Sequence, residues 1–321
     1  MLLLDETNAI SYFSSHGIEA LRVIPLGGGV SNVVLLVETG SKRLVVKQAL
    51  ERLKVKEEWL SDPRRTLREC ASIRQLAAHL PAGAVPSILF EDQENCIYGM
   101  TAAAADAEDW KTQLLRGEIR PAVAANIGAT LGAIMQTTSS GSAWQEQFGD
   151  QTVFDQLRLD PYYRFTATRH PDLKPQFDAI IASASTRRYC LVHGDYSPKN
   201  FLVAGNAAMA IDFEVVHFGD PSFDAAFLLN HLRLKSFFRP QWAVEYAVAA
   251  AAFWQALQPA VAELDWFEPA TIAHLGGLML ARIDGKSPAE YIAEDALRQQ
   301  VRQYARNLML HPPKSVLEVF A

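Results

Sequence analysis

The pattern of apolar and polar positions changes near residue 100, and the change predicts two regions of different structure. Before it, short runs rich in Val, Leu and Ile alternate with glycine-containing turns, a pattern typical of β-strands. The strands expected there are Ala20–Ile24, Asn32–Glu38, Arg43–Gln48, Val85–Phe90 and Cys96–Met100. Between the third and fourth runs, Arg64–Leu80 carries apolar residues at helical spacing and is followed by Pro81, which predicts a helix.

After residue 100 the apolar spacing is mainly helical. The helices expected there are Pro121–Thr137, Pro171–Ser183, Ser222–Leu234, Pro240–Leu257, Pro269–Arg282 and Glu294–Met309. One β-rich island interrupts them, comprising Tyr189–Val192, Phe201–Val203 and Met209–Ile211, with Gly205-Asn206 as a hairpin turn. The chain therefore reads as α+β, with a small sheet region at 1–100 and a larger helical region at 101–321. A cleft between two such regions is where chemistry is expected.

Composition and charge narrow the function classes. The 321 residues are enough to bury a core without disulfides or a structural metal. The 36 acidic against 30 basic residues give a net charge of -6, which disfavours a nucleic-acid partner. Three distant cysteines without metal-site spacing favour reduced thiols in a cytoplasmic protein. The N-terminus lacks signal-peptide features, and Glu245 and Gln255 interrupt the most apolar stretch, so no membrane partner is expected. The pattern specifies no oligomeric state.

The densest group of chemically active residues lies in His193–Asn200 and in Ile211–Glu214. Asp195 and Asn200 fall in a loop between two expected strands, and Asp212 follows the next strand of the hairpin. Three oxygen-bearing side chains are therefore expected to converge on one edge of a small ribbon. Such hard oxygen ligands suit Mg²⁺, which uses few protein ligands alongside phosphates and waters.

The string H-G-D-x-x-x-x-N followed by I-D-F-E resembles the aminoglycoside phosphotransferase and choline kinase group, small-molecule relatives of protein kinases. The resemblance implies a two-lobed protein-kinase-like fold. It implies that Asp195 is the catalytic base that orients the substrate hydroxyl, and that Asn200 and Asp212 are the Mg²⁺ ligands. Gly219–Asp224 also matches the family's G-D-P-x-x-D, in which Asp220 and Asp224 are expected to brace the site.

The first hundred residues contain the other parts of a kinase nucleotide site in the expected order. Glycines in Leu26–Asn32 permit close approach of backbone N–H groups to phosphates, although the loop departs from G-x-G-x-x-G. Lys47 on the next strand would hold the α- and β-phosphates, with Glu69 on the following helix as its partner, or else Glu57 or Glu58. The predicted nucleotide-binding set is Gly28, Gly29, Ser31, Lys47, Glu69 and Met100, the last in the expected hinge Tyr98–Ala103.

These features predict an ATP-dependent phosphotransferase with a hydroxyl acceptor, using ATP (or GTP) and Mg²⁺. The partner is a small hydroxylated molecule: an aminoglycoside, a choline-like amine, a homoserine-like amino acid or a thioribose sugar. The short interval between Asp212 and Asp224 leaves no room for a long activation loop, which favours a small-molecule kinase over a regulated protein kinase. Two alternatives are a metal-dependent phosphohydrolase built on His193 and the nearby acids, and a nucleotide-binding module without catalysis.

Substrate contacts are expected from the helical region. Asp109 and Trp110 follow the hinge and either face the acceptor or begin a solvated helix. Arg282, Asp284 and Lys286 lie in a polar patch between apolar helices and are candidates for the acceptor site. Within that patch, Ser287–Glu290 has the capping-box pattern of a helix start. Lys199 is given no chemical role.

Overall fold

A computed structural model describes residues 2–27, 32–50, 63–139 and 141–321. The chain divides into two compact units. One comprises Met1–Ala105 together with Ile211–Glu214, and the other comprises Asp106–Ala210 together with Val215–Ala321. Each unit is described below by itself.

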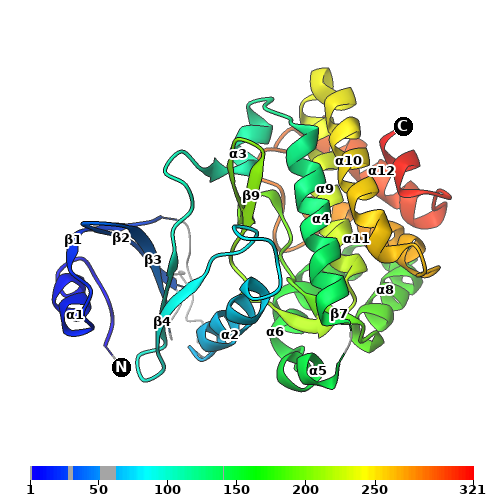
Figure 1. The fold of residues 1–321 in the computed structure, drawn as a ribbon. Coiled ribbons are helices and arrows are strands. Elements are labelled where there is room, and N and C mark those ends of the chain that lie inside the picture. The colour runs from blue at the N-terminus through cyan, green and yellow to red at the C-terminus, as the bar shows by residue number, and fades with distance from the viewer. Residues whose placement is uncertain (1, 28–31, 51–62, 140) are drawn as a thin grey trace. The chain divides into compact units, whose positions relative to one another are not determined.

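The N-terminal unit is built on a five-stranded antiparallel sheet in the order β1-β2-β3-β5-β4 (Figure 1). Its strands are β1 (Ala20–Pro25), β2 (Asn32–Thr39), β3 (Arg43–Ala49), β4 (Ile88–Asp92) and β5 (Ile97–Thr101). Its helices are α1 (Ala9–Ser15) and α2 (Arg65–Ala77). The five predicted strands and the predicted helix after the third of them are confirmed. Helix α1 was not anticipated from the sequence.

Strand β3 shows how this sheet positions a functional side chain. Leu44 and Val46 are buried in an apolar cluster that includes Phe13 of α1. Successive residues of a strand point to opposite faces, so Lys47 lies on the other face. There its ammonium bonds Glu69 of α2. The two-residue period of the strand therefore separates the apolar core from the ion pair.

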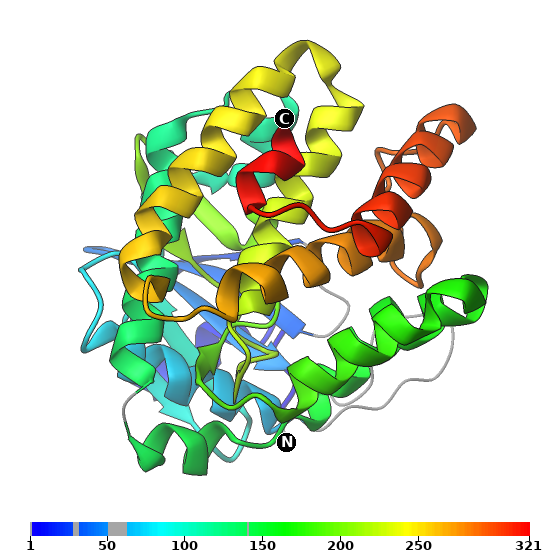
Figure 2. The same cartoon turned by 90° about the vertical axis from the view of Figure 1, so that its right-hand side faces the viewer.

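The C-terminal unit is mainly helical (Figures 1 and 2). Its helices are α3 (Trp110–Leu115), α4 (Pro121–Thr138), α5 (Ser142–Phe148), α6 (Thr152–Phe154), α7 (Phe165–Arg169), α8 (Lys174–Thr186), α9 (Ser222–Phe238), α10 (Ala243–Val261), α11 (Phe267–Asp284) and α12 (Asp295–Leu310). A π-helix, Asp155–Arg164, connects α6 to α7. Short 3₁₀ turns occupy Pro171–Leu173, Pro198–Asn200, Pro240–Trp242 and Val316–Phe320. Helix α9 packs against both α10 and α11. The six helices predicted after residue 100 are confirmed to within a few residues.

The three strands of the predicted β-rich island are confirmed to within a few residues, but they belong to two separate sheets. β8 (Phe201–Ala204) and β9 (Ala207–Ala210) form the expected hairpin, but this hairpin pairs with β6 (Glu108–Asp109). β7 (Cys190–Val192) belongs to a separate two-stranded sheet with β10 (His217–Gly219). Strands as short as β6 and β10 contain too few residues to show an alternating pattern, so their sequences did not reveal these partners.

The capping-box pattern at Ser287–Glu290 does not begin a helix, and the next helix starts only at Asp295. The backbone N–H of Ala289 donates instead to the carbonyl of Arg282, at 2.7 Å. The Ser287 hydroxyl accepts a hydrogen bond from the Arg282 guanidinium, at 2.8 Å. These contacts fold the segment back on the end of α11 and use the groups that would otherwise cap a helix.

Across the described ranges, no helix has both the length and the apolar character needed to span a bilayer.

The contact between α4 and α10 depends on a glycine. A Cβ atom on Gly128 would lie 2.2 Å from the backbone carbonyl oxygen of Phe253. Replacing a helical glycine by alanine gains ~1 kcal/mol in helix propensity, whereas overpacking costs about 1–3 kcal/mol or more. Because the obstructing atom is backbone, we predict that Gly128→Ala lowers the free energy of unfolding by about 2 kcal/mol in urea denaturation. Gly40 has no neighbour within 4 Å of its added Cβ, so Gly40→Ala is the control and should be neutral. Equal stabilities of the two variants would contradict the packing argument.

Candidate active site

Lys47 is the centre of the polar cluster in the N-terminal unit. Its ammonium lies 2.9 Å from Oε1 of Glu69 and 2.6 Å from Oδ1 of Asp212. The Lys47 and Glu69 side chains are almost fully buried. Burial alone lowers the pKa of Lys47, but the carboxylates of Asp212 and Glu69 outweigh it and raise that pKa well above its usual value. Lys47 is therefore held as a cation.

For the carboxyl group of Glu69, burial has a larger effect on the pKa than the neighbouring charge does. Burial raises the pKa of Glu69 to about 7, although Lys47 acts to lower it. Its Oε2 atom has no hydrogen-bond partner among the described residues. The predicted pairing of Lys47 with Glu69 is thus present in the structure, whereas Glu57 and Glu58 lie outside the described residues.

Asp212 occupies an unusual backbone position in this cluster. Its φ of 68° lies in the left-handed region, which few residues other than glycine adopt. Asn and Asp tolerate that region better than bulkier residues, because their short polar side chains bond locally. Two residues later, Glu214 accepts a hydrogen bond at 3.2 Å from the amide of Asn32 at the start of β2. Asp212 and Glu214 thus place two carboxylates in the unit that holds Lys47.

The loop His193–Asn200 is held from several sides within the C-terminal unit. Asp224 of α9 accepts hydrogen bonds from the backbone N–H groups of His193 and Gly194, at 2.7 and 2.9 Å. The Tyr196 hydroxyl donates to the carbonyl of Ile127 in α4, at 2.8 Å. Gly194 has a φ of +76°, a conformation that favours glycine. These contacts fix the loop that carries Asp195.

Two cations meet at Asp195. Arg158 Nη2 lies 3.3 Å and Lys199 Nζ lies 2.9 Å from Asp195 Oδ2. Arg158 also donates from Nε to the carbonyl of Gly194, at 2.6 Å. The amide of Asn200 donates to the backbone carbonyl of Asp195, at 2.9 Å. Asp195 is therefore a buried carboxylate, oriented by two positive charges.

Sequence reasoning missed both of these cations. Lys199 lies within the motif, four residues after Asp195, but was given no role, because the helical spacing rule does not apply in this loop and only its fold brings the two side chains together. Arg158 lies far from the loop in sequence, on the π-helix Asp155–Arg164. Such helices are frequent at functional sites, but sequence periodicity does not reveal them.

Asp220 and Asp224 both hold the start of α9, as the sequence analysis expected of bracing residues. Asp220 accepts from the backbone N–H and the hydroxyl of Ser222, at 3.0 and 2.6 Å, and pairs with Arg187. Asp224 is fully buried, and burial raises its pKa to about 7 against the effect of its two backbone donors.

The structure places the other predicted nucleotide and substrate contacts as follows. Met100 lies on β5 opposite Val45 and is almost fully buried. Gly28, Gly29 and Ser31 lie outside the described residues. Asp109 caps α3 by accepting from the N–H of Thr112, at 2.9 Å, so the helix-start interpretation is correct.

Asp284 and Lys286, two of the candidates for the acceptor site, form ion pairs. Asp284 bonds His170 and Arg302, at 2.9 and 2.6 Å. Lys286 pairs with Asp160 at 2.9 Å. Asp284 and Lys286 are thus tied into the packing of the unit, while Arg282 bonds only neutral side chains among the described residues.

The donor set of the N-terminal unit fits nucleotide phosphates and a divalent metal. Lys47 offers a buried cation, and Asp212 and Glu214 offer hard oxygen ligands. No group of three or more His, Cys, Asp or Glu side chains in the described part of the chain is arranged to enclose a metal ion. Mg²⁺ is bound mainly by phosphates and waters with one or two carboxylates, so a sparse set of this kind suits it.

A comparison with known families decides the assignment. The profile of the phosphotransferase enzyme family matches residues 22–260, which include Lys47, Glu69, the loop His193–Asn200 and Asp212. The chain belongs to this family.

Curated members similar to this chain include two methylthioribose kinases. The Escherichia coli protein is 26% identical over 254 residues, which are 70% of this chain and 60% of that protein. The Bacillus cereus protein is 24% identical over 268 residues, which are 74% of this chain and 68% of that protein. The matched segment thus spans less than two thirds of the Escherichia coli enzyme.

Solved structures of a kinase and of a phosphotransferase share the fold. Amicoumacin kinase, solved with AMP-PNP, Ca²⁺ and Ami, superposes with a TM-score of 0.61 at 14% identity, covering 99% of this chain and 98% of that chain. Spectinomycin phosphotransferase, solved with ADP and spectinomycin, gives 0.56 at 14% identity over the same shares. The predicted α+β, protein-kinase-like fold is confirmed.

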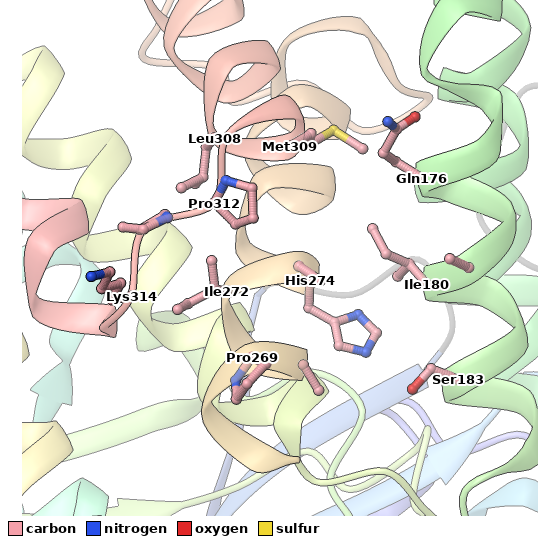
Figure 3. A pocket seen from close by; sticks show the side chains of 14 residues that line it. Gln176, Ile180, Ser183, Pro269, Ile272, His274, Leu308, Met309, Pro312 and Lys314 are labelled. Atoms are coloured by element: carbon pink, nitrogen blue, oxygen red, sulfur yellow. The ribbon is translucent and has the colours of Figure 1, made fainter. Parts of the chain in front are cut away.

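A pocket elsewhere in the C-terminal unit contains none of the predicted site residues. It has a volume of about 480 Å³ and lies among α8, α11, α12 and the segment that follows α12 (Figure 3). Its lining is mostly apolar, with Ile180, Ile272 and Leu308 among the residues. Burial lowers the pKa of His274, which also lines it, to about 4, so this imidazole is neutral near pH 7.

The two hydrogen bonds of Asp224 support a direct test. We predict that Asp224→Asn lowers the free energy of unfolding by about 1–3 kcal/mol, because an amide accepts only one of the two N–H groups well. Hydrogen exchange at the amides of His193 and Gly194 should accelerate more than at other buried amides. Asp178→Asn, at an exposed ion pair on α8, is the matched control. Unchanged exchange at these two amides would contradict the bracing role.

Proposed function

We propose that this protein is a kinase that transfers the γ-phosphate of ATP to a hydroxyl of a small molecule. The observation that carries the proposal is the buried Asp195, held by Arg158 and Lys199 in a loop that α9 fixes through Asp224. The buried Lys47, paired with Glu69 and Asp212, supports it from the N-terminal unit. Membership of the phosphotransferase enzyme family supports both assignments.

Charge and burial support the proposed phosphate-binding roles. Lys47 would bind the α- and β-phosphates, with Glu69 fixing the position of its ammonium. Asp212 and Asn200 are the residues that would hold Mg²⁺, and Glu214 is a further oxygen donor beside Asp212. The metal, when bound, neutralises charge on the transferred phosphoryl group. Gly28, Gly29, Ser31 and Met100 remain proposed nucleotide contacts.

Asp195 is the proposed catalytic base. The acceptor hydroxyl oxygen forms a bond to the γ-phosphorus while the bond from that phosphorus to the β,γ-bridging oxygen breaks, which leaves ADP. The hydroxyl proton passes to the carboxylate of Asp195. Positioning accounts for most of the catalysis, because phosphoryl transfer requires alignment and charge stabilisation more than covalent chemistry.

The acceptor is a small hydroxylated metabolite. Methylthioribose kinases are among the relatives, which supports a sugar-like hydroxyl as the receiving group. All three cysteines are buried, which supports the proposed reducing, cytoplasmic location.

We predict that Asp195→Asn lowers kcat by about 10²–10⁴-fold, the range typical of a removed general base. The Kd for Mg²⁺–ATP, measured by calorimetry, should stay within about threefold, because Asp195 acts on the acceptor. Turnover is measured as ADP formation with a pool of hydroxylated metabolites.

Two outcomes would contradict this role of Asp195. One is full turnover in the variant, and the other is loss of Mg²⁺–ATP binding with an intact fold. Release of phosphate from esters without added nucleotide would favour the phosphohydrolase alternative. Asp178→Asn is again the control and should keep the activity of the unaltered protein.

A further inference from the structure

One face of α9 connects the catalytic loop with a buried lysine. His231 and Lys235 follow Asp224 by seven and eleven residues, a spacing that places all three on the same side of a helix. Asp224 holds the loop at His193 and Gly194. At 1.5 Å per residue, Lys235 lies roughly 16 Å further along the helix axis. The face therefore runs from the loop that carries Asp195 towards Lys235.

Side-chain contacts make this face continuous with Asp195. The Arg158 guanidinium, paired with Asp195, lies 5.9 Å from the ring centroid of Phe227. The rings of Phe227 and His231 are 5.4 Å apart. Lys199, the second partner of Asp195, lies near enough to His231 to affect its pKa. Arg158, Phe227 and His231 therefore form a continuous series of contacts that leads from Asp195 towards Lys235.

Lys235 is a buried amine without a carboxylate partner in the described part of the chain. Its side chain has no solvent exposure. Its Nζ donates to the carbonyl of His231 at 3.4 Å and lies 5.3 Å from the ring centroid of Tyr291. A buried ammonium normally needs a counter-charge, because burial removes its hydration. The fold supplies only a carbonyl and an aromatic ring.

The neighbours of Lys235 are mostly cations as well. Burial, with the charges of Lys111 and Arg282, lowers the pKa of Lys235 to about 7. Asp109 opposes this shift, but its carboxylate already accepts from the N–H and the hydroxyl of Thr112. The local charge balance is therefore positive.

His231 and Arg282 show the same excess of positive charge. Burial, followed by four cations, lowers the pKa of His231 well below its usual value, so this imidazole is neutral. Arg282 lies on α11, which packs beside α9 (Figure 1). It donates to the hydroxyls of Ser287 and Tyr162, at 2.8 and 3.4 Å, and both are neutral acceptors. Arg282 and Lys111 are half-buried, so these two members of the cluster lie partly at the surface of the unit.

We infer that the acceptor carries an anionic group, a carboxylate or a phosphate ester, and that Lys235, His231 and Arg282 bind this group while the acceptor hydroxyl faces Asp195. The inference rests on the proposed function. The anionic group would supply the negative charge that no described carboxylate provides beside Lys235. A cationic acceptor such as an aminoglycoside or choline would be repelled by the same cluster, so the charges also select against it.

Matched acceptor pairs test the charge preference. Turnover is compared between ribose and ribose 5-phosphate, between glycerol and glycerate, and with glucosamine as a cation. We expect kcat/KM to be at least tenfold higher for an anionic member than for its neutral counterpart. The two pairs distinguish a phosphate ester from a carboxylate. Equal or higher kcat/KM for the neutral or cationic acceptors would overturn the inference and leave the proposed function intact.

The variant Lys235→Met tests the residue itself, since methionine keeps the length of the side chain and removes the charge. It should raise KM for the anionic acceptor at least tenfold, with KM for Mg²⁺–ATP within about twofold. Lys174→Met, at an exposed ion pair on α8, is the matched control and should change neither value.

Binding without turnover separates this inference from the proposed function. Calorimetry measures binding of ribose 5-phosphate, glycerate and inorganic phosphate to protein saturated with Mg²⁺–AMP-PNP. At least tenfold weaker binding of one of these anions by Lys235→Met supports the site even if no acceptor is phosphorylated. If the unaltered protein binds none of these anions, or if the variant binds them equally well, the inference is overturned.

The buried amine also predicts how stability depends on pH. The pKa of Lys235 is about 7 in the folded protein, against ~10.4 for an unfolded lysine. Between these values the unfolded chain binds more protons, so Lys235 destabilises the fold less as pH rises, and its full cost is present below about pH 7. The stability that Lys235→Met gains over the unaltered protein in urea denaturation should therefore be largest near pH 6 and shrink towards pH 10. An equal gain at both pH values would show that Lys235 is not held as an unpaired buried amine.

Discussion

Burial of the Lys47 ammonium with the carboxylates of Glu69 and Asp212 is the constraint on which the N-terminal unit depends. Removing one member of such a cluster leaves an uncompensated buried charge, which is strongly destabilising. The pairing therefore ties three distant parts of the chain together: the third strand, the helix after it, and the short segment Ile211–Glu214. It also holds a cation in place for anionic phosphates, so the same interaction serves stability and the proposed nucleotide binding.

The C-terminal unit also contains a buried charge, the carboxylate of Asp195. A buried carboxylate needs donors or cations, and Arg158 and Lys199 provide them. Asp224 fixes the loop through two backbone N–H groups. The unit contrasts two buried charges: Asp195 has partners within the fold, whereas Lys235 has none among the described carboxylates. This contrast supports the proposed roles of Asp195 in catalysis and of Lys235 in binding a charged ligand.

The sequence predicted the features that depend on neighbouring residues better than those that depend on residues far apart in the chain. Strands and helices with several periods of alternation were predicted well, because local periodicity determines which face is buried. The motif residues Asp195, Asn200 and Asp212 were identifiable because they lie within twenty residues of one another. β6 and β10 are too short to carry a pattern. Arg158 and the partners of Asp284 act across long sequence separations, and only tertiary packing brings them together. The nucleotide, metal and acceptor roles remain proposals.

The most direct test of the account is to follow the labelled phosphoryl group itself. The purified protein is incubated with ATP labelled at the γ-phosphate, Mg²⁺ and a pool of hydroxylated metabolites, and the labelled products are separated. The account predicts that the label appears in an organic phosphate ester, in amounts equal to the ADP formed. Label found only in inorganic phosphate, or retained in ATP by a protein that does not bind the nucleotide, would contradict the assignment of a small-molecule kinase.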